Sequence, residues 1–340
     1  MRPFPIVKVL IVMISLLLLV AACSSSQDTG TTKEEAALDY PKEDINILVG
    51  YAPGGGTDTM ARVMIQALNN NGIVDQTFQV ENLPGASGVN AFIKMQKESD
   101  DDHQIMIVPE MGIPLVNGSF DAGYDDFIPV AQASTGTVAM VVGKNSPYET
   151  AEEVIEAIEK DPASVSISIP GALDSAEPYR WYTIFEEIGS DIELGDLNTI
   201  PTGGLSEVIT SIVGEHTDVA LLSASKGIVD QAEVGNMKVL AVLSPERLEQ
   251  FPDTPTLVEL GINIVHDKAR GIWMGKDVPE EVVQYWEDVM SKIETTPEWQ
   301  EYLEQEMLQA TFKDSEAYLD FLKTEGESFG AYIKRIEENR

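Results

Sequence analysis

A glycine-rich loop between a strand-like run and a helix-like run is the part of this sequence best suited to hold a small molecule. The loop reads Ala52-Pro53-Gly54-Gly55-Gly56-Thr57-Asp58. Three glycines let the backbone turn tightly and let a ligand approach the amides. Thr57 or Asp58 could cap the following helix, and the free N–H groups of its first turn favour an anion. A carboxylate or a phosphate could therefore bind here without lysine or arginine; a plain strand-to-helix turn is the alternative interpretation.

A second loop of small residues repeats this arrangement further along the chain. It lies between another strand-like run and another helix-like run and reads Glu81-Asn82-Leu83-Pro84-Gly85-Ala86-Ser87-Gly88. In an open α/β sheet, the loops at the carboxyl ends of neighbouring strands face one crevice. The two loops together therefore predict a ligand cleft.

The elements that must position these loops alternate in type. Strands are expected at 45–49, 78–81, 105–108, 137–142, 165–169, 218–222 and 239–243. Helices are expected at about 58–68, 91–97, 150–160, 176–188, 205–213, 227–233, 280–293, 298–306 and 315–338. This alternation predicts an α/β fold whose mostly parallel sheets are flanked by helices. So many strands over about 300 residues exceed one core, so two sheets are expected.

The N-terminal segment has the pattern of an export signal. Arg2 and Lys8 accompany an apolar run, and the only cysteine, Cys23, follows two alanines. The run is short for a bilayer core of about 30 Å, which favours a signal sequence over a transmembrane helix. A cysteine after small residues resembles a bacterial lipobox, which implies cleavage before Cys23 and acylation of its thiol; an uncleaved anchor or an ordinary signal peptide is the alternative. We expect a lipoprotein signal peptide at 1–22, a flexible linker at 23–40, and a body held outside the cytoplasm by lipid, without disulfides.

The composition is strongly acidic. The chain has 57 acidic and 22 basic side chains, a formal net charge of −35. Loss of residues 1–22 would bring it to about −37, because Arg2 and Lys8 lie there. Nucleic acid and anionic lipid headgroups should be repelled by such a surface. We attribute the acidity to a solvated exterior suited to high salt or high pH; attraction of cationic ligands is the alternative.

No cofactor and no metal is predicted. His216 and His266 have no second ligand at metal-binding spacing. The run from Asp100 to His103 is expected to be a solvated turn. Thr59 stands where a dinucleotide-binding fingerprint has its last glycine.

The two loops belong to a longer series of motifs that resembles a known family. ILVGYAPGGGTDTMAR and VENLPGASG are followed, in order, by FIPVAQ, IPTGG and VLAVLSPERLEQFPDTPTLVELG. From about Pro41 to the C-terminus the chain resembles the extracytoplasmic receptors of tripartite tricarboxylate transporters, the Bug-type substrate-binding proteins. The resemblance implies a two-lobed, type II-like periplasmic-binding-protein fold, with lobe 1 at 41–142 plus about 266–340 and lobe 2 at about 143–265. It implies a protein that is not an enzyme, captures a small organic acid between its lobes and delivers it to membrane permease subunits; we expect a monomer.

The resemblance also assigns ligand-binding positions. In the family the first loop holds a ligand carboxylate, the second loop forms another wall, and further segments come from the other lobe. The matching residues here are Pro53, Gly54, Gly55, Gly56, Thr57, Asp58, Asn82, Gly85, Ala86, Ser87, Gly88, Ala172, Ser175, Thr202, Gly203, Gly204 and Asp218. Near Gly171 the family usually has a histidine, but this chain has Glu177 at about that place. This departure leaves the ligand's identity open.

Two other classes of function stay open. A receptor that reports a solute to a membrane kinase would have the same fold and cleft. An exported hydrolase would need a nucleophile and a base; the S-x-x-K pattern from Ser223 to Lys226 lacks its K-T-G and S-D-N partners, so a chance match is expected.

Overall fold

The computed structural model describes residues 38–170 and 176–338. The described residues from Tyr40 onward form one compact unit. The predictions for the signal peptide, for Cys23, for the linker up to residue 37, and for Ala172 and Ser175 lie outside the described residues.

The first sheet has six strands in the order β11-β4-β10-β3-β1-β2. Their bounds are β1 Ile45–Val49, β2 Phe78–Asn82, β3 Gln104–Pro109, β4 Phe127–Gly136, β10 Lys268–Gly275 and β11 Leu308–Lys313. Strands β2, β1 and β3 are parallel, whereas β10 runs antiparallel to both β3 and β4, and β11 antiparallel to β4. The helices between and after these strands are α2 Gly56–Asn70, α3 Val89–Lys97, α4 Ile113–Val116, α9 Glu280–Ile293, α10 Pro297–Gln305 and α11 Ser315–Glu338.

The second sheet repeats this plan with five strands in the order β7-β6-β8-β5-β9. Their bounds are β5 Val138–Gly143, β6 Ser166–Pro170, β7 Asn198–Thr202, β8 Val219–Ser223 and β9 Met237–Val242. Its helices are α5 Ala151–Lys160, α6 Ala176–Glu187, α7 Leu205–Val213 and α8 Lys226–Glu233. Strands β7, β6 and β8 are parallel, and β5 is antiparallel to β8 and β9. The predicted two-lobed α/β fold is confirmed, with the addition that both sheets are mixed and that only three neighbouring strands of each are paired in parallel.

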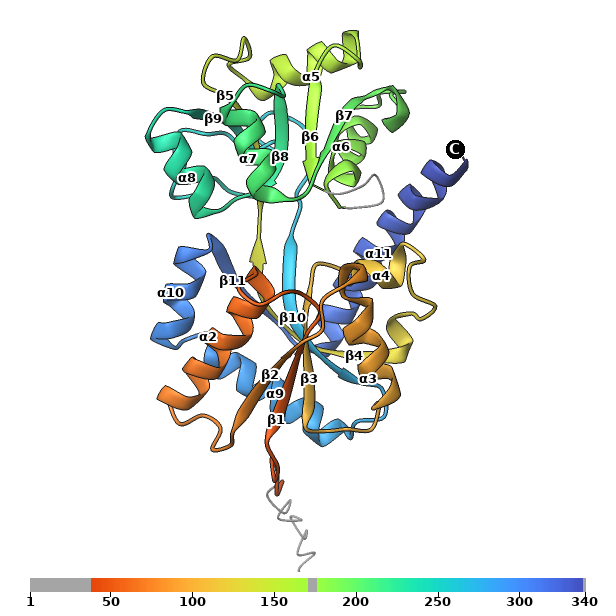
Figure 1. The fold of residues 1–340 in the computed structure, drawn as a ribbon, viewed down its shortest axis with the longest axis vertical. Coiled ribbons are helices and arrows are strands. Elements are labelled where there is room, and N and C mark those ends of the chain that lie inside the picture. Colours follow the sequence, from red (N-terminus) through yellow and green to blue (C-terminus); the bar gives the residue numbers. More distant parts are fainter. Residues whose placement is uncertain (1–37, 171–175, 339–340) are drawn as a thin grey trace, which may run out of the picture. The chain divides into compact units, whose positions relative to one another are not determined.

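The chain passes between the sheets in extended segments. Strand β4 of the first sheet is followed after one residue by β5 of the second, and β10 returns the chain to the first sheet beside β4, with Lys268 opposite Gly136 (Figure 1). The first lobe was expected to continue to residue 142, but β5 pairs within the second sheet, because Val138 to Gly143 find their hydrogen-bond partners on β8 and β9.

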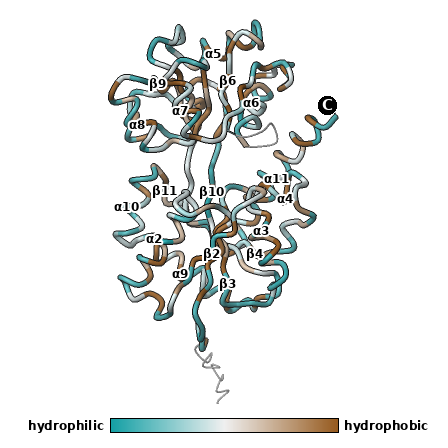
Figure 2. The backbone as a smooth tube through the Cα atoms, viewed as in Figure 1, coloured by the Kyte–Doolittle hydropathy of each residue, from teal (hydrophilic) through white to brown (hydrophobic). Residues whose placement is uncertain are grey.

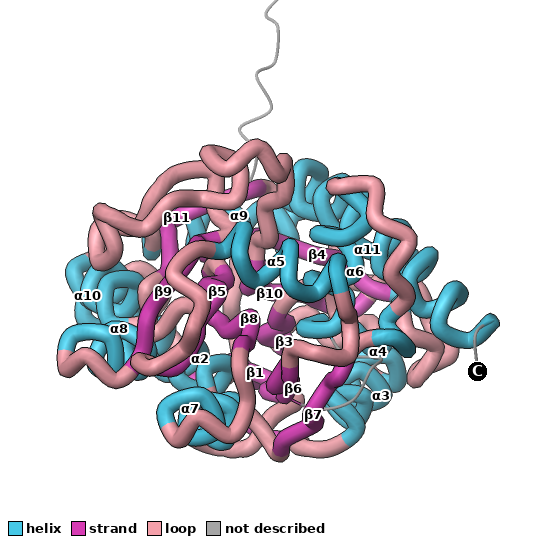
Figure 3. Tube along the Cα trace, turned by 90° about the horizontal axis from the view of Figure 1, so that it is seen from above, coloured by secondary structure: helices cyan, strands magenta, loops and turns pink. Residues whose placement is uncertain are grey.

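The central strands of the first sheet are apolar on both faces and pack against helices on both, and Figure 3 shows helices around the strands. On β1, Ile45, Ile47 and Val49 pack with residues of α2, α9 and α10, whereas Leu48 belongs to the cluster that includes α3 and α11. The alternation follows from the two-residue period of a strand. Hydrophobic stretches accordingly alternate with hydrophilic ones along the chain (Figure 2).

The C-terminal helix α11 packs against α6 of the second lobe. Tyr179 of α6 meets Phe329 of α11 edge-on, with ring centroids 5.1 Å apart. Arg335 near the end of α11 donates to Glu193 at 3.0 Å. These contacts connect the two lobes in addition to the crossing strands. Among the described helices, none is long and apolar enough to cross a bilayer.

Candidate functional site

A cavity of about 270 Å³ lies where residues of both lobes meet. The residues that line it are Tyr51, Gly56, Thr57, Pro109, Glu110, Ile113, Ala176, Glu177, Lys268, Ala269 and Arg270. They come from the first loop and the start of α2, from the end of β3, from α6 of the second lobe, and from the crossing strand β10. The predicted position of a cleft at the carboxyl end of β1 therefore coincides with a real cavity.

Two features give one part of the cavity a positive charge, the first turn of α2 and the guanidinium of Arg270, and we call them together the positive pole. Helix α2 begins at Gly56 with Gly55 as its N-cap, and no side chain caps its first turn. The first amides of a helix have no intrahelical acceptor and carry a partial positive charge. The guanidinium of Arg270 lies over this turn, with Nη2 3.2 Å from the point that a Cβ on Gly56 would occupy. Glycine at this position lets the guanidinium approach.

Arg270 is oriented by a neutral partner. Its Nη1 donates to the hydroxyl of Tyr302 at 2.7 Å. Within the described part of the chain, no carboxylate lies within ion-pair distance of Arg270. A half-buried cation beside a helix N-terminus, in a protein with a net charge of −35, leaves a local positive charge that an anion can neutralise.

Asp58 supports the first loop from inside. Its side chain is buried and accepts hydrogen bonds from the Gly54 amide at 2.9 Å, from Arg62 at 2.8 and 3.0 Å, and from Asn82 at 3.0 Å. The hydrogen bond from Arg62, followed by those from Gly54 and Asn82, outweighs burial and lowers the pKa of Asp58 to about 2. Asp58 was predicted to contact the ligand or cap the helix; instead it joins the two loops.

The structure predicts a pH-dependent loss of stability for Asp58→Asn. The pKa of Asp58 falls from 3.8 to about 2 on folding, which corresponds to about 2 kcal/mol at neutral pH. A lowered pKa stabilises the fold above the unfolded-state value, and the contribution disappears as the pH falls towards 2. In urea unfolding, Asp58→Asn should therefore be about 2 kcal/mol less stable than the wild type at pH 7, with a clearly smaller difference at pH 3. Asp230→Asn, which breaks an exposed pair with Lys226, should change stability by less than about 0.5 kcal/mol. A difference that is equal at both pH values would contradict this role of Asp58.

Three further charged side chains, Glu110, Glu177 and Lys268, line the cavity, and Arg180 pairs with them from α6 without lining it. Glu110 follows β3, Lys268 begins β10, and Glu177 and Arg180 lie on α6. Oε1 of Glu110 is 2.8 Å from Lys268 Nζ and 3.3 Å from Arg180 Nη2. Oε1 of Glu177 is 2.9 Å from Arg180 Nη1 and 3.6 Å from Lys268 Nζ. We call these four residues the interlobe cluster; its charges balance.

The interlobe cluster keeps Glu110 ionised although the residue is buried. Burial alone would raise its pKa, but the charges of Lys268 and Arg180 and their hydrogen bonds more than compensate, and the pKa of Glu110 is lowered. Lys268 also donates to the hydroxyl of Ser223 at 2.7 Å, at the end of β8 in the second sheet. The cluster therefore joins the first lobe to two elements of the second.

The second loop supports the cavity without lining it. Asn82 donates to the carbonyl of Tyr51 at 3.1 Å, and the hydroxyl of Tyr51 donates to the carbonyl of Ser87 at 3.1 Å. Ser87 and Gly88 face a neighbouring apolar space of only about 10 Å³, roughly the room for one water. Of the predicted first- and second-loop residues, Gly56 and Thr57 line the cavity; those that do not are Pro53, Gly54, Gly55, Asp58, Asn82, Gly85, Ala86, Ser87 and Gly88.

The predicted residues of the second lobe have structural partners. Thr202 donates to the Ile169 carbonyl at 3.2 Å, the Gly203 amide donates to Glu207 at 2.7 Å, and Gly204 precedes α7. Asp218 lies before β8, at the end of the strand opposite Ser223, and accepts from the amide and hydroxyl of Ser166 at 2.8 and 2.6 Å. Asp218 was assigned to the ligand site by resemblance, with a structural role as an equal alternative. Its pairing with Ser166 at the amino end of β8 favours the structural role, because the cavity lies at the carboxyl ends of the parallel strands.

Several cavity residues were not predicted as ligand contacts. They are Tyr51, Pro109, Glu110, Ile113, Ala176, Glu177, Lys268, Ala269 and Arg270. The nearest sequence signal is positional: Tyr51 and Glu110 directly follow strands, where the loops of an open α/β sheet form ligand sites. Lys268 and Arg270 carry no such signal, since they lie within a strand that pairs with residues far away in the sequence.

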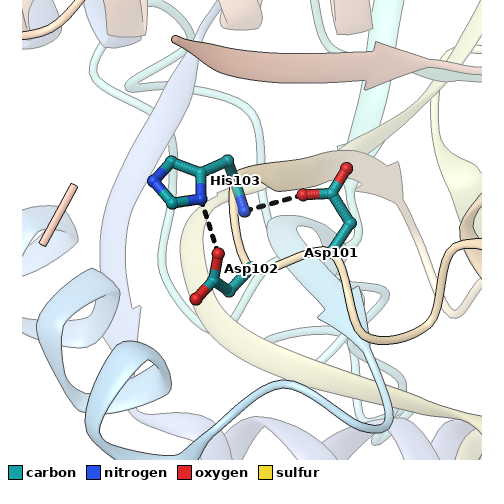
Figure 4. Close-up of side chains that lie close together, drawn as sticks. All are labelled: Asp101, Asp102 and His103. Carbon is teal, nitrogen blue, oxygen red and sulfur yellow. Dashed lines mark hydrogen bonds and ion pairs between the residues drawn. The ribbon is translucent and has the colours of Figure 1, made fainter. Parts of the chain in front are cut away.

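A group of three possible metal ligands lies elsewhere, before β3 (Figure 4). Asp101 accepts from the amide of His103, Asp102 contacts Nδ1 of His103, and Nε2 of His103 accepts from the Lys42 amide at 3.0 Å. Both ring nitrogens of the histidine already have partners. The geometry matches a hydrogen-bonded turn, and we assign no metal to it.

The S-x-x-K pattern does not form a catalytic pair. Lys226 contacts Asp230 on the next turn of α8 at 2.6 Å, whereas Ser223 accepts from Lys268. The nucleophile and the base of a hydrolase must lie within hydrogen-bonding reach. Ser223 and Lys226 instead have separate partners.

Comparison with known proteins identifies a family. A UPF0065 protein from the gbd 5′ region of Cupriavidus necator is 26% identical over 299 residues, covering 87% of this chain and 88% of that protein. The crystal structure of a TctC solute-binding protein from Polaromonas, without ligand, superposes with a TM-score of 0.74 at 24% identity, covering 87% of this chain and 99% of that one. MatC from Rhodopseudomonas palustris, solved with bound malate, has a TM-score of 0.67 at 19% identity, with 86% and 100% covered. The model of the TctC family, described as the tripartite tricarboxylate transporter family receptor, matches residues 60–337. The two-lobed α/β fold, the cavity between the lobes and this match together show that the chain belongs to the receptor family of the tripartite tricarboxylate transporters.

Proposed function

We propose that this protein captures a small organic acid outside the cytoplasm and delivers it to the membrane subunits of a tripartite tricarboxylate-type transporter. The carboxylate of the solute would bind at the positive pole, and the second lobe would close the other side. The neighbour MatC was solved with malate, a hydroxylated dicarboxylate, which supports a small organic acid as the ligand here without fixing the number of its carboxylates. Family membership supports the role in transport.

The positive pole is the observation that carries the proposal. The uncapped first turn of α2 offers amide donors, and Arg270 adds a charged donor on the same side of the cavity. A carboxylate can accept both kinds of hydrogen bond. The cavity of about 270 Å³ has the size of a small metabolite site.

A thermal-unfolding screen of the full chain tests the ligand class. The panel contains mono-, di- and tricarboxylates, amino acids, polyamines and inorganic sulfate. A solute at 100 times its dissociation constant adds about 2.7 kcal/mol, which should raise Tm by several degrees in a protein of this size. We expect a response to at least one carboxylate and none to sulfate. A response to polyamines alone would contradict the proposal, because it would mean that the acidic surface is the binding feature.

The transport role is tested separately from binding. Deleting the gene should abolish high-affinity uptake of the labelled solute, and the full chain should restore it. If uptake is unaffected while a solute-dependent transcriptional response is lost, the protein is a sensing receptor for a membrane kinase instead.

We propose that Cys23 anchors the protein to the membrane through lipid. The proposal depends on the run from Arg2 to Cys23, in which an apolar segment and two alanines precede the thiol. Cys23→Ser should abolish incorporation of labelled palmitate and move the protein from the membrane fraction to the soluble fraction. The unchanged protein is the control. Equal membrane association of both forms, without label in either, would favour an uncleaved apolar anchor.

A further inference from the structure

The cavity that Arg270 lines also contains a carboxylate acceptor. Glu177 lines the cavity, and its Oε1 accepts from Arg180. Within the described residues, nothing donates a hydrogen bond to its other oxygen. Glu110 pairs with Arg180 and Lys268 through its Oε1 and adds a second negative charge. Its buried Oε2 has no hydrogen-bond partner among the described residues. Acceptors around these two carboxylates therefore exceed donors.

The two cations of the interlobe cluster already have hydrogen-bond and ion-pair partners within the protein. Arg180 divides its Nη atoms between Glu177 and Glu110, and its side chain is only 4% exposed. Lys268 donates to Ser223 and is 2.8 Å from Glu110. Two carboxylates and two cations balance, so the cluster has no unpaired positive charge for a second anionic group. A third carboxylate placed beside Glu177 would meet like charges without a new counter-ion.

The positive pole and the interlobe cluster therefore favour different groups on the solute. Arg270 and the first turn of α2 attract an anion, whereas Glu177 requires a hydrogen-bond donor. We propose that the protein selects a carboxylic acid that carries a donor group, a hydroxyl or an ammonium, at its other end, and that Glu177 discriminates against dicarboxylates. This inference rests on the proposed function, because it assumes that one carboxylate occupies the positive pole.

Matched acids of one carbon skeleton test the selectivity directly. We would titrate the full chain calorimetrically with butyrate, 4-hydroxybutyrate, 4-aminobutyrate and succinate, and with the corresponding five- and six-carbon series. Within the series that fits best, the hydroxy or the amino acid should bind at least about tenfold tighter than the dicarboxylate. The ranking of the hydroxyl against the ammonium identifies the donor.

Glu177→Gln provides the decisive variant. Glutamine keeps the shape and one acceptor but adds an amide donor that a second carboxylate can use. The variant should lose most of the preference and bind the dicarboxylate at least about tenfold better than the wild type does. Glu186 lies on the same helix but outside the cavity. The control variant Glu186→Gln should therefore leave all affinities unchanged. Arg180 retains Glu110 in the variant, and a cooperative thermal unfolding transition like that of the wild type verifies that the variant is folded.

The possible outcomes separate this inference from the proposed function. If the dicarboxylate binds the wild type as tightly as the donor-bearing acid, or if Glu177→Gln leaves their ratio unchanged, the selectivity role of Glu177 is overturned while carboxylate capture stands. If no acid of any length binds, carboxylate capture itself fails and the inference fails with it.

Discussion

Arg270→Gln should weaken carboxylate binding by roughly 10- to 100-fold while the protein stays folded. A hydrogen bond to a charged group contributes about 1.5–3 kcal/mol, and the change removes the guanidinium that lies over the first turn of α2. The remaining amides keep part of the affinity. Calorimetric titration with the best carboxylate of the screen measures the loss directly.

Two further variants define what Arg270 does. Arg270→Lys keeps the charge but not the planar pair of donors, so we expect an intermediate affinity. Arg247→Gln removes an exposed guanidinium that pairs with Glu259 far from the cavity residues and should not change binding. If Arg270→Gln binds the solute as well as the wild type, the positive pole is not where the carboxylate lies.

Glu110→Ala should lower the free energy of unfolding by about 3–5 kcal/mol at pH 7. Removing one member of a buried ion cluster leaves buried charge without full compensation. Here Lys268 and Arg180, which lie 2.8 and 3.3 Å from Glu110, would share Glu177 as their remaining partner and leave one net positive charge. The side chain of Glu110 is only 13% exposed, so water cannot fully replace it. Urea unfolding measures the loss.

The pH dependence gives a second readout for Glu110. Its pKa is lowered in the folded protein, because the two cations overcome the effect of burial. Its contribution to stability is therefore present above the unfolded-state value of about 4.3 and declines as the pH falls below that. The difference in free energy of unfolding between wild type and Glu110→Ala should therefore decrease in acid.

Glu149→Ala is the control for this prediction. The Glu149 side chain is 70% exposed and pairs with Lys238, so its removal should lower the free energy of unfolding by less than about 1 kcal/mol. A loss for Glu110→Ala as small as that of Glu149→Ala would mean that the cluster does not join the lobes.

Four strands were not predicted, namely β4, β7, β10 and β11, and three of them share a physical explanation. Strand β4 contains Gln132, Ser134 and Thr135, which are buried but polar, so they interrupt the apolar pattern; Gln132 and Thr135 are satisfied by Thr311 on β11. Strand β10 begins with Lys268 and contains Gly271, a composition typical of a loop. Strand β7 lies at a sheet edge, where Pro201 is tolerated. Periodicity predicts strands in which apolar and polar residues alternate or in which all residues are apolar. Strands β4, β7 and β10 have neither pattern, and they form because strands far away in the sequence pair with them.

The sequence by itself determined the local elements and the loops that end them. The helix at 151–160 follows from Thr150, whose hydroxyl accepts from the Glu153 amide, and the glycine loop follows from residues that turn a strand into a helix within seven positions. Glycine conformation, helix capping and hydrophobic periodicity depend on residues that are close in sequence, so they can be predicted from one stretch of sequence. The interlobe cluster is different, because Glu110, Arg180 and Lys268 come from three distant segments. Nothing in their local sequence marks them, and only the fold brings Arg180 and Lys268 within 3.3 Å of Glu110. Only the tertiary structure decided which side chains line the cavity, because charges interact through space and their partners are chosen by how the two sheets and the crossing strands meet.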